Sequence, residues 1–313
     1  MVAFNTGAHL GDPRLFVLEA DEAFGTFRHL HLSGLLVNNI EADHLDHYGT
    51  IAQLEEAFAQ VAQRTEGSVV ACIDDPGVRR LAERTPVVGY GMSPEAPWRV
   101  ENLLQGAGGV RFALVGPDGA SVDVAVPRPG AHVALNAAGT LALLGELGYD
   151  VALAASGLAS YAGVRRRYEI RARVGGVTIV DDYAHHPTEI AATVAAGRST
   201  EGGRIWAVFQ PHRYSRTADL APEFGEPLAA ADRVIVTDIY PAGEAPIPGV
   251  SGKIVAEAVA AADGDVEYIA RLNDVPDHIG PRLERGDVVL LLGAGDVASI
   301  ADLLVEEISR SIP

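Results

Sequence analysis

Val177-Thr-Ile-Val-Asp-Asp-Tyr-Ala-His-His-Pro-Thr-Glu189 carries a short apolar run directly into a turn crowded with polar side chains. An apolar run that ends abruptly in acids and histidines is typical of a buried parallel strand, which delivers its last side chains to the carboxyl edge of a sheet. Similar runs follow, with room for helices between them, at 205–209, 233–237, 266–269 and 288–292. The second half of the chain is therefore predicted to form a Rossmann-like α/β domain.

The first half of the chain shows the same alternation. Residues 15–18, 34–37 and 68–73 are predicted strands, and the first two end in polar residues, as buried parallel strands do. Residues 51–64 have the apolar spacing of a helix, and Asp75-Pro76 supplies a cap and a first-turn proline for the next helix. These features predict a mostly parallel sheet here as well.

An antiparallel hairpin is expected after this βαβ pattern. Two runs of strand type, 112–115 and 121–126, flank the turn Gly116-Pro-Asp-Gly119, and a helix is predicted from His132 to Leu147. A chain of 313 residues exceeds one ordinary core and fits two domains of about 150 residues each. We expect the boundary in the alanine-rich stretch 151–161, which gives domains of 1–158 and 159–313.

Composition limits the possible partners. Hydrophobic residues make up 48% and charged residues 21%, and the longest apolar runs are far shorter than the roughly 20 residues of a membrane span. A net charge of −18 would repel a phosphate backbone, so neither nucleic acid nor membrane is an expected partner. Cys72 is the only cysteine, which excludes an internal disulfide and fits the reducing cytoplasm that we expect as the location.

Two acidic segments each follow a predicted strand. Glu19-Ala-Asp-Glu22 holds three carboxylates, and Asn39-Ile-Glu-Ala-Asp-His-Leu-Asp46 places His44 among three acids. Oxygen ligands with one imidazole suit magnesium or manganese beside phosphate oxygens better than a closed zinc site. An acid-rich helix start is the alternative for the first segment, but two acidic strand ends in one sheet favour a metal site.

Two polar turns in the second half could carry further chemistry. Asp181 to Glu189 contains two acids, a tyrosine and two histidines, and adjacent histidines on a turn point in different directions, so we expect one functional histidine. Arginines in Gln210-Pro-His-Arg-Tyr-Ser-Arg-Thr217 could bind a carboxylate bidentately, although an exposed basic turn is the simpler alternative.

No segment of the chain has the spacing of a phosphate-binding loop. Gly249-Val-Ser-Gly-Lys-Ile254 ends in isoleucine and lacks the Gly-x-x-x-x-Gly-Lys-Ser/Thr pattern. Gly293-Ala-Gly-Asp296 has two glycines and is a weak dinucleotide fingerprint that close helix packing explains equally well.

Taken together, the polar segments resemble the motifs of the Mur ligases of peptidoglycan synthesis, in the same order and over essentially the whole chain. The likeness is strongest to the branch that joins L-alanine to UDP-N-acetylmuramate, and the branch that reattaches recycled murein peptides is the nearest enzymatic alternative. The matching segments are Glu19–Glu22, Asn39–Asp46, Asp181–Glu189, Phe209–Thr217 and Tyr240–Gly249.

This resemblance implies a P-loop-type central ATPase domain, here partial and with an appended hairpin, followed by a Rossmann-like C-terminal domain that binds the amino acid. It implies ATP and Mg²⁺ as cofactors and UDP-N-acetylmuramate and L-alanine as substrates. The substrate carboxylate is converted to an acyl phosphate, which the amine attacks, so catalysis is mostly positioning and charge neutralisation.

The resemblance also assigns roles to individual residues. Glu19 and His44 would hold magnesium. Asn136, Arg167 and Asp182 would lie on the nucleotide side. The residues expected around L-alanine are Tyr183, His185, Arg213 and Arg216. The residues expected to be catalytic are Glu19, His44, Arg167 and His185.

Departures from the family pattern are equally informative. The glycine-rich loop with its lysine and threonine would lie before residue 1, Val133 replaces a usual asparagine, and Ala23-Phe24 replaces a usual Ser-Asp pair. We therefore expect this chain to be inactive alone and to leave apolar surface near residues 1–18 open to solvent or to a partner, and a separate N-terminal segment is one candidate for that partner. The alternative from another class is a noncatalytic remnant.

Overall fold

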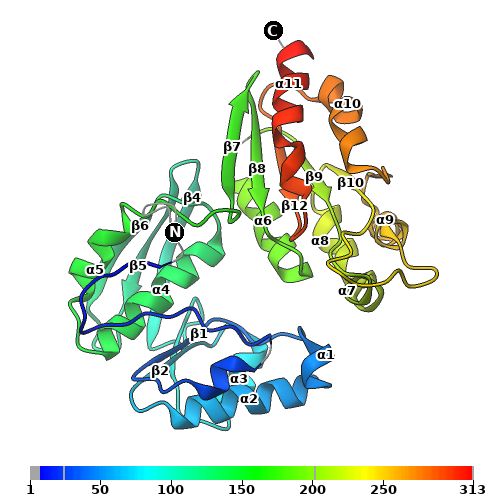
Figure 1. The fold of residues 1–313 in the computed structure, drawn as a ribbon. Helices are drawn as coiled ribbons and strands as arrows, with labels where there is room; N and C mark the ends of the chain where they lie inside the picture. The colour runs from blue at the N-terminus through cyan, green and yellow to red at the C-terminus, as the bar shows by residue number, and fades with distance from the viewer. Residues whose placement is uncertain (1–7, 24, 201, 312–313) are drawn as a thin grey trace.

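The computed structural model of the protein describes residues 8–311 apart from residues 24 and 201. Within this range the chain forms two six-stranded sheets, with strand orders β1-β2-β3-β4-β5-β6 and β11-β10-β9-β12-β8-β7. Figure 1 shows them in separate lobes, the first coloured blue to green and the second green to red. The predicted α/β class is confirmed in both halves of the chain.

The first sheet is parallel from β1 to β4 and antiparallel from β4 to β6. The predicted hairpin is present as β5 and β6, and β4 extends it by a strand that the sequence pattern did not predict. The strands are β1 (Leu35–Val37), β2 (Val69–Cys72), β3 (Val88–Gly91), β4 (Trp98–Gly106), β5 (Gly109–Val115) and β6 (Ser121–Val126).

Helices cover both faces of this sheet, α2 and α3 on one and α4 and α5 on the other. The cap expected from sequence is formed, because Asp75 accepts the N–H of Val78 at the start of α3. Thr50 caps α2 in the same way by accepting the N–H of Gln53. The helical elements are η1 (Thr26–His29), α1 (Leu45–Tyr48), α2 (Ile51–Arg64), α3 (Pro76–Ala82), α4 (Ala131–Glu146) and α5 (Val151–Leu158).

The strand predicted at 15–18 is wrong. These residues have no regular structure, and Phe16 and Val17 are 86% and 81% exposed. β1 pairs with β2 on one side, and no described strand lies on its other side. An apolar run becomes a buried strand only when a neighbour accepts its backbone hydrogen bonds, so the run at 15–18 remains exposed.

The second sheet is parallel from β11 to β8, and β7 is antiparallel at its edge. β12 lies between β8 and β9, and all five of its side chains are buried. The five strands predicted from apolar runs are present, whereas β7 was not predicted. The strands are β7 (Glu169–Val174), β8 (Val177–Asp182), β9 (Ile205–Phe209), β10 (Arg233–Val236), β11 (Val266–Tyr268) and β12 (Val288–Leu292).

Helices α6, α8 and α9 pack on one face of the second sheet, and α10 and α11 pack on the other. The longer helices are α6 (Pro187–Thr200), α7 (Tyr214–Leu220), α8 (Gly225–Ala229), α9 (Gly252–Ala261), α10 (Val275–Ile279) and α11 (Ala301–Ser311). Single turns of 3-10 helix are η2 (Pro222–Phe224), η3 (Leu272–Asp274), η4 (Gly280–Arg282) and η5 (Val297–Ile300). None of the helices in the described part of the chain combines the length and apolar character needed to span a bilayer.

Candidate active site

The turns that follow β8, β9, β10 and β12 meet at the carboxyl edge of the second sheet. Backbone hydrogen bonds join them: Arg213 donates to the carbonyl of Tyr240 at 2.9 Å, and Gly293 donates to that of Asp182 at 3.1 Å. Parallel strands end at one edge, so segments distant in sequence become neighbours there. The two polar turns singled out in the sequence, 181–189 and 210–217, therefore lie side by side.

Asp182 organises the first of these turns. Its Oδ1 accepts the N–H of Ala184 and its Oδ2 accepts that of Tyr168, both at 2.8 Å. Burial raises the pKa of this carboxyl, against the two backbone donors that favour its charged form. Because both carboxylate oxygens accept hydrogen bonds, Asp182 connects the segment around Tyr168, which leads from the first domain into the second, to the end of β8.

Arg166 also connects this segment to the second sheet, through contacts that the sequence did not indicate. Its Nη2 donates to the carbonyl of Gly293 at 2.6 Å and to that of Gly295 at 3.1 Å, and its Nε lies 3.5 Å from the buried carboxylate of Asp181. Arg166 has a left-handed backbone with φ 57°, which turns its side chain inward while the neighbouring Arg167 stays exposed. In the run Arg165-Arg166-Arg167, residue type alone does not distinguish the half-buried arginine from the exposed ones.

Aromatic rings form a row across the ends of β8, β9 and β10. Tyr183 meets His185 edge-on at 5.2 Å between ring centroids, and His185 lies 6.0 Å from His212. His212 stacks on Tyr240 at 5.6 Å with an interplanar angle of 8°. The guanidinium groups of Arg166 and Arg167 lie 4.9 and 5.4 Å from the centroid of the Tyr183 ring, within cation–π range.

Burial favours the neutral form of both histidines of this row. It lowers the pKa of His185, and, together with the proximity of the His185 ring and the charge of Arg216, it lowers the pKa of His212 to about 4. A neutral imidazole can accept a proton, which an ammonium group must lose before it attacks a carbonyl. Within the described residues, the buried Nδ1 of His212 and Oε1 of Gln210 have no hydrogen-bond partner.

Glu189 holds the start of α6 and both adjacent histidines. Its Oε2 accepts the N–H groups of His185 and His186 at 2.9 and 3.2 Å, and its Oε1 accepts Nη1 of Arg167 at 3.1 Å. The two rings then diverge, since Nδ1 of His185 lies 2.9 Å from the carbonyl of Tyr183 while Nδ1 of His186 lies 3.3 Å from Glu41. The expected difference in direction is confirmed.

Arg213 is paired within its own domain. Its Nε donates to Glu244 at 2.7 Å, and the same carboxylate accepts the N–H and the hydroxyl of Ser215 at 3.0 and 2.6 Å. Burial acts to raise the pKa of Glu244, but these donors and the charge of Arg213 lower it to about 2. Glu244 therefore fixes both the arginine and the first turn of α7.

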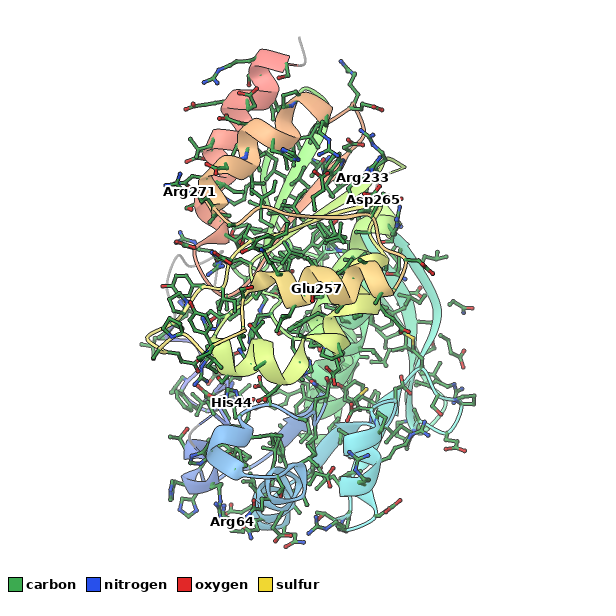
Figure 2. All side chains as sticks on the ribbon, turned by 90° about the vertical axis from the view of Figure 1, so that its right-hand side faces the viewer. His44, Arg64, Arg233, Glu257, Asp265 and Arg271 are labelled. Atoms are coloured by element: carbon green, nitrogen blue, oxygen red, sulfur yellow. The ribbon has the colours of Figure 1, made fainter. Side chains whose placement is uncertain are left out.

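The acidic segment after β1 faces this edge from the first domain. Arg216 donates through Nη2 to both oxygens of Asp43, at 2.7 and 3.0 Å, and Thr188 donates to Glu41 at 2.6 Å. Burial acts to raise the pKa of Asp43, and the bonds and charge of Arg216 outweigh it, so that the pKa is lowered. Figure 2 shows the adjacent His44 on the side of the first domain that is turned toward the second.

His44 is placed beside Glu22 rather than Glu19. Its Nε2 lies 3.8 Å from Oε1 of Glu22 and 3.7 Å from Oδ2 of Asp43, whereas Glu19 lies in the exposed segment and has no ion pair to His44 in the described structure. The motif Glu19–Glu22 offered three carboxylates, and sequence alone could not select among them.

The donor set near His44 fits a hard cation in part. An imidazole and a carboxylate 3.8 Å apart could be adjacent ligands of Mg²⁺, which takes further oxygen ligands from water and phosphate. Among the described residues, no three His, Cys, Asp or Glu side chains are close enough to hold a metal ion on their own. The side chain of Asp46 and all of Phe24 lie outside what the structure describes.

The predicted nucleotide-side residues are dispersed. Asn136 is exposed on α4, Arg167 is half-exposed beside Glu189, and Asp182 is buried against backbone donors. His132, one turn before Asn136, has a buried Nδ1 without a partner in the described range, and burial, followed by the charge of Arg167, lowers its pKa.

Sequence comparison relates both domains to one family. Residues 12–144 match the Mur ligase middle domain, and residues 166–295 match the Mur ligase glutamate ligase domain. The chain is 41% identical to the UDP-N-acetylmuramate–L-alanine ligase of Acidothermus cellulolyticus over 98% of this chain and 68% of that protein. It is 40% identical to the ligase of the same name from Myxococcus xanthus, over 96% of this chain and 65% of that protein.

Solved structures agree with this relation. The UDP-N-acetylmuramate-alanine ligase of Thermotoga maritima aligns with a TM-score of 0.75 and 25% identity, over 93% of this chain and 63% of that one. A murein peptide ligase from Psychrobacter arcticus shares the fold, with a TM-score of 0.61 and 20% identity over 91% and 59%. The chain spans about two thirds of the length of the curated relatives it matches. This protein belongs to the Mur ligase family.

Proposed function

We propose that these 313 residues are the larger part of an ATP-dependent ligase that joins L-alanine to the carboxylate of UDP-N-acetylmuramate. The observation that carries the proposal is the 38–42% identity, over nearly the whole chain, to relatives named for that pair of substrates. The division at residues 158 and 159 into an ATPase domain and an amino-acid domain is part of the same proposal.

The amino-acid side of the reaction belongs to the carboxyl edge of the second sheet. Tyr183, His185, Arg213 and Arg216 gather there, and guanidinium groups are suited to bind the carboxylate of L-alanine. The imidazole of His185 is neutral and is held by the carbonyl of Tyr183. His185 is thus suited to accept the proton that the amine must lose.

The phosphate side belongs to the first domain. ATP with Mg²⁺ would supply the activation of the substrate carboxylate and neutralise the charge that develops on phosphate. His44 would be one protein ligand, with Glu22 beside it and Glu19 as the ligand proposed from sequence. Asn136, Arg167 and Asp182 complete the proposed nucleotide side, Asp182 by holding the turn between the domains.

A second candidate is a noncatalytic Mur ligase relative. It is favoured by Val133, which stands where the family resemblance expects an asparagine. Under the first proposal, the exposed apolar segment at 15–18 and the edge of β1 that has no neighbouring strand among the described residues would pack against a further part of the ligase.

Phosphate release separates the two candidates. The chain alone should release no phosphate from ATP with UDP-N-acetylmuramate and L-alanine, and release should appear when the part of the Acidothermus cellulolyticus relative that the chain does not span is added. His44→Ala should then abolish turnover, whereas His31→Ala, at an exposed position, should not. Continued absence of turnover in the completed protein would favour the noncatalytic candidate, and an unaffected His44→Ala variant would remove the metal assignment.

A further inference from the structure

Arg216, one of the two arginines proposed for the amino-acid carboxylate, already binds a carboxylate of the chain itself. Its Nη2 donates to Oδ1 and Oδ2 of Asp43 at 2.7 and 3.0 Å. The arginine lies in the first turn of α7 in the second domain, and the aspartate follows β1 in the first domain, 173 positions earlier. The interaction therefore spans the domain boundary.

The surroundings make this interaction more than an exposed ion pair. The Arg216 side chain is 10% exposed and that of Asp43 is 28% exposed. A guanidinium stays charged throughout the physiological pH range, so a buried one requires a permanent anionic or polar partner. Among the described residues, Asp43 is the one carboxylate that forms an ion pair with Arg216.

A second carboxylate cannot simply join the first. Two carboxylates at one Nη2 would lie close to 4 Å apart and repel each other by roughly 4 kcal/mol at an effective dielectric constant of 20. A ligand carboxylate that takes the Nη2 position of Arg216 must therefore exchange with Asp43.

We propose that Asp43 acts as an internal carboxylate at Arg216, and that the α-carboxylate of the incoming amino acid displaces it and so breaks one contact between the domains. This inference rests on the proposed function, which places the amino acid at Arg216. It makes Asp43 a competitor that lowers the apparent affinity for the amino acid, and it couples amino-acid binding to the contact between the two domains.

The chain offers a matched control for loss of domain contact alone. Glu41 also joins the domains, through the hydroxyl of Thr188 at 2.6 Å and Nδ1 of His186 at 3.3 Å, and it makes no ion pair with Arg216 in the described structure. Glu41→Gln therefore weakens the contact between domains but leaves Asp43 on Arg216, whereas Asp43→Asn removes the competing charge.

The test is an NMR titration of the 313-residue chain with L-alanine and, separately, with acetate as the simplest carboxylate. Asp43→Asn should bind at least one of the two probes about tenfold more tightly than the wild type. Glu41→Gln and Asp43→Glu, which both keep a carboxylate on Arg216, should stay within about twofold of the wild type, and Arg216→Gln added to Asp43→Asn should remove the gain.

The titrations distinguish carboxylate exchange at Arg216 from loss of contact between the domains alone. If Asp43→Asn binds neither probe more tightly than the wild type, or if Glu41→Gln produces the same gain, the exchange is overturned. A gain for acetate without one for L-alanine supports the exchange and counts against L-alanine as the ligand, so failure of the proposed function is distinguishable. The amide and side-chain spectra of each variant show directly whether it is folded.

Discussion

Replacing Asp182 tests how the site is held together. Asp182→Ala removes the acceptor of two backbone N–H groups, those of Tyr168 and Ala184, from a side chain that is 6% exposed. Hydrogen bonds to a charged group contribute about 1.5–3 kcal/mol each, and the donors left behind are poorly placed to reach water, so we expect a loss of roughly 3–5 kcal/mol. Asp182→Asn keeps one acceptor and should lose about half of that.

Urea unfolding monitored by tryptophan fluorescence measures this loss. Trp206 is buried in the second domain and Trp98 lies in the first, so a Trp98→Phe background makes the signal specific to the second domain. Asp219→Asn, at an exposed position on α7, is the control and should change stability by less than about 0.5 kcal/mol. If Asp182→Ala unfolds within about 1 kcal/mol of this control, Asp182 does not hold the turn in the way described here.

Three further perturbations test neighbouring parts of the site. The pKa of His212 is about 4 in the folded chain, below its unfolded value. The stabilisation linked to neutral His212 is therefore complete above about pH 6.5 and is lost as pH falls toward 4. In the His212→Gln variant, the free energy of unfolding should fall by about 2–3 kcal/mol less over that pH range than in the wild type. The pKa of Glu244 is about 2, so the stabilisation linked to its charged form is present above about pH 4.5 and is lost as pH falls toward 2. Glu244→Gln should lower the free energy of unfolding by about 2 kcal/mol at neutral pH and should abolish its dependence on pH between about 4.5 and 2. An unchanged pH dependence would count against the contacts with Arg213 and Ser215. A Cβ at Gly295 would lie 2.5 Å from both Gln210 Oε1 and Tyr240 Cγ, so Gly295→Ala should cost about 1–3 kcal/mol in urea unfolding, and a neutral effect would show that the glycine-rich turn is not closely packed.

Helices and strands could be predicted from the sequence where the local sequence pattern and the tertiary packing favour the same structure. α2 begins and ends at the predicted residues because Thr50 caps it and its apolar spacing matches a buried face. The run at 15–18 has the same apolar character as the true strands, but whether a strand forms depends on a neighbour that composition does not reveal. β7 was missed because its alternation of charged and apolar residues suits a half-exposed edge strand, which lacks the continuous apolar run of a central one.

The candidate site was predictable as a set of segments but not as a set of contacts. Strand ends indicated which polar turns share an edge, and those of the second domain do. Which acid partners which base depends on how the two domains meet, so the pairing of Asp43 with Arg216 across 173 positions was not visible in the sequence. Within the first domain, the family resemblance named Glu19 as the carboxylate partner of His44, whereas the structure places Glu22 beside it.

Under the proposed function, the carboxyl edge of the second sheet holds the amino acid that the ligase adds. The most direct measurement is mass spectrometry of the UDP-linked product formed from ATP, UDP-N-acetylmuramate and an equimolar mixture of amino acids. The enzyme is the chain together with the part of the Acidothermus cellulolyticus relative that the chain does not span. We predict UDP-N-acetylmuramoyl-L-alanine as the product, and its loss in the Arg216→Ala variant but not in Asp219→Asn. Formation of a different product, or undiminished alanine addition by Arg216→Ala, would contradict this account.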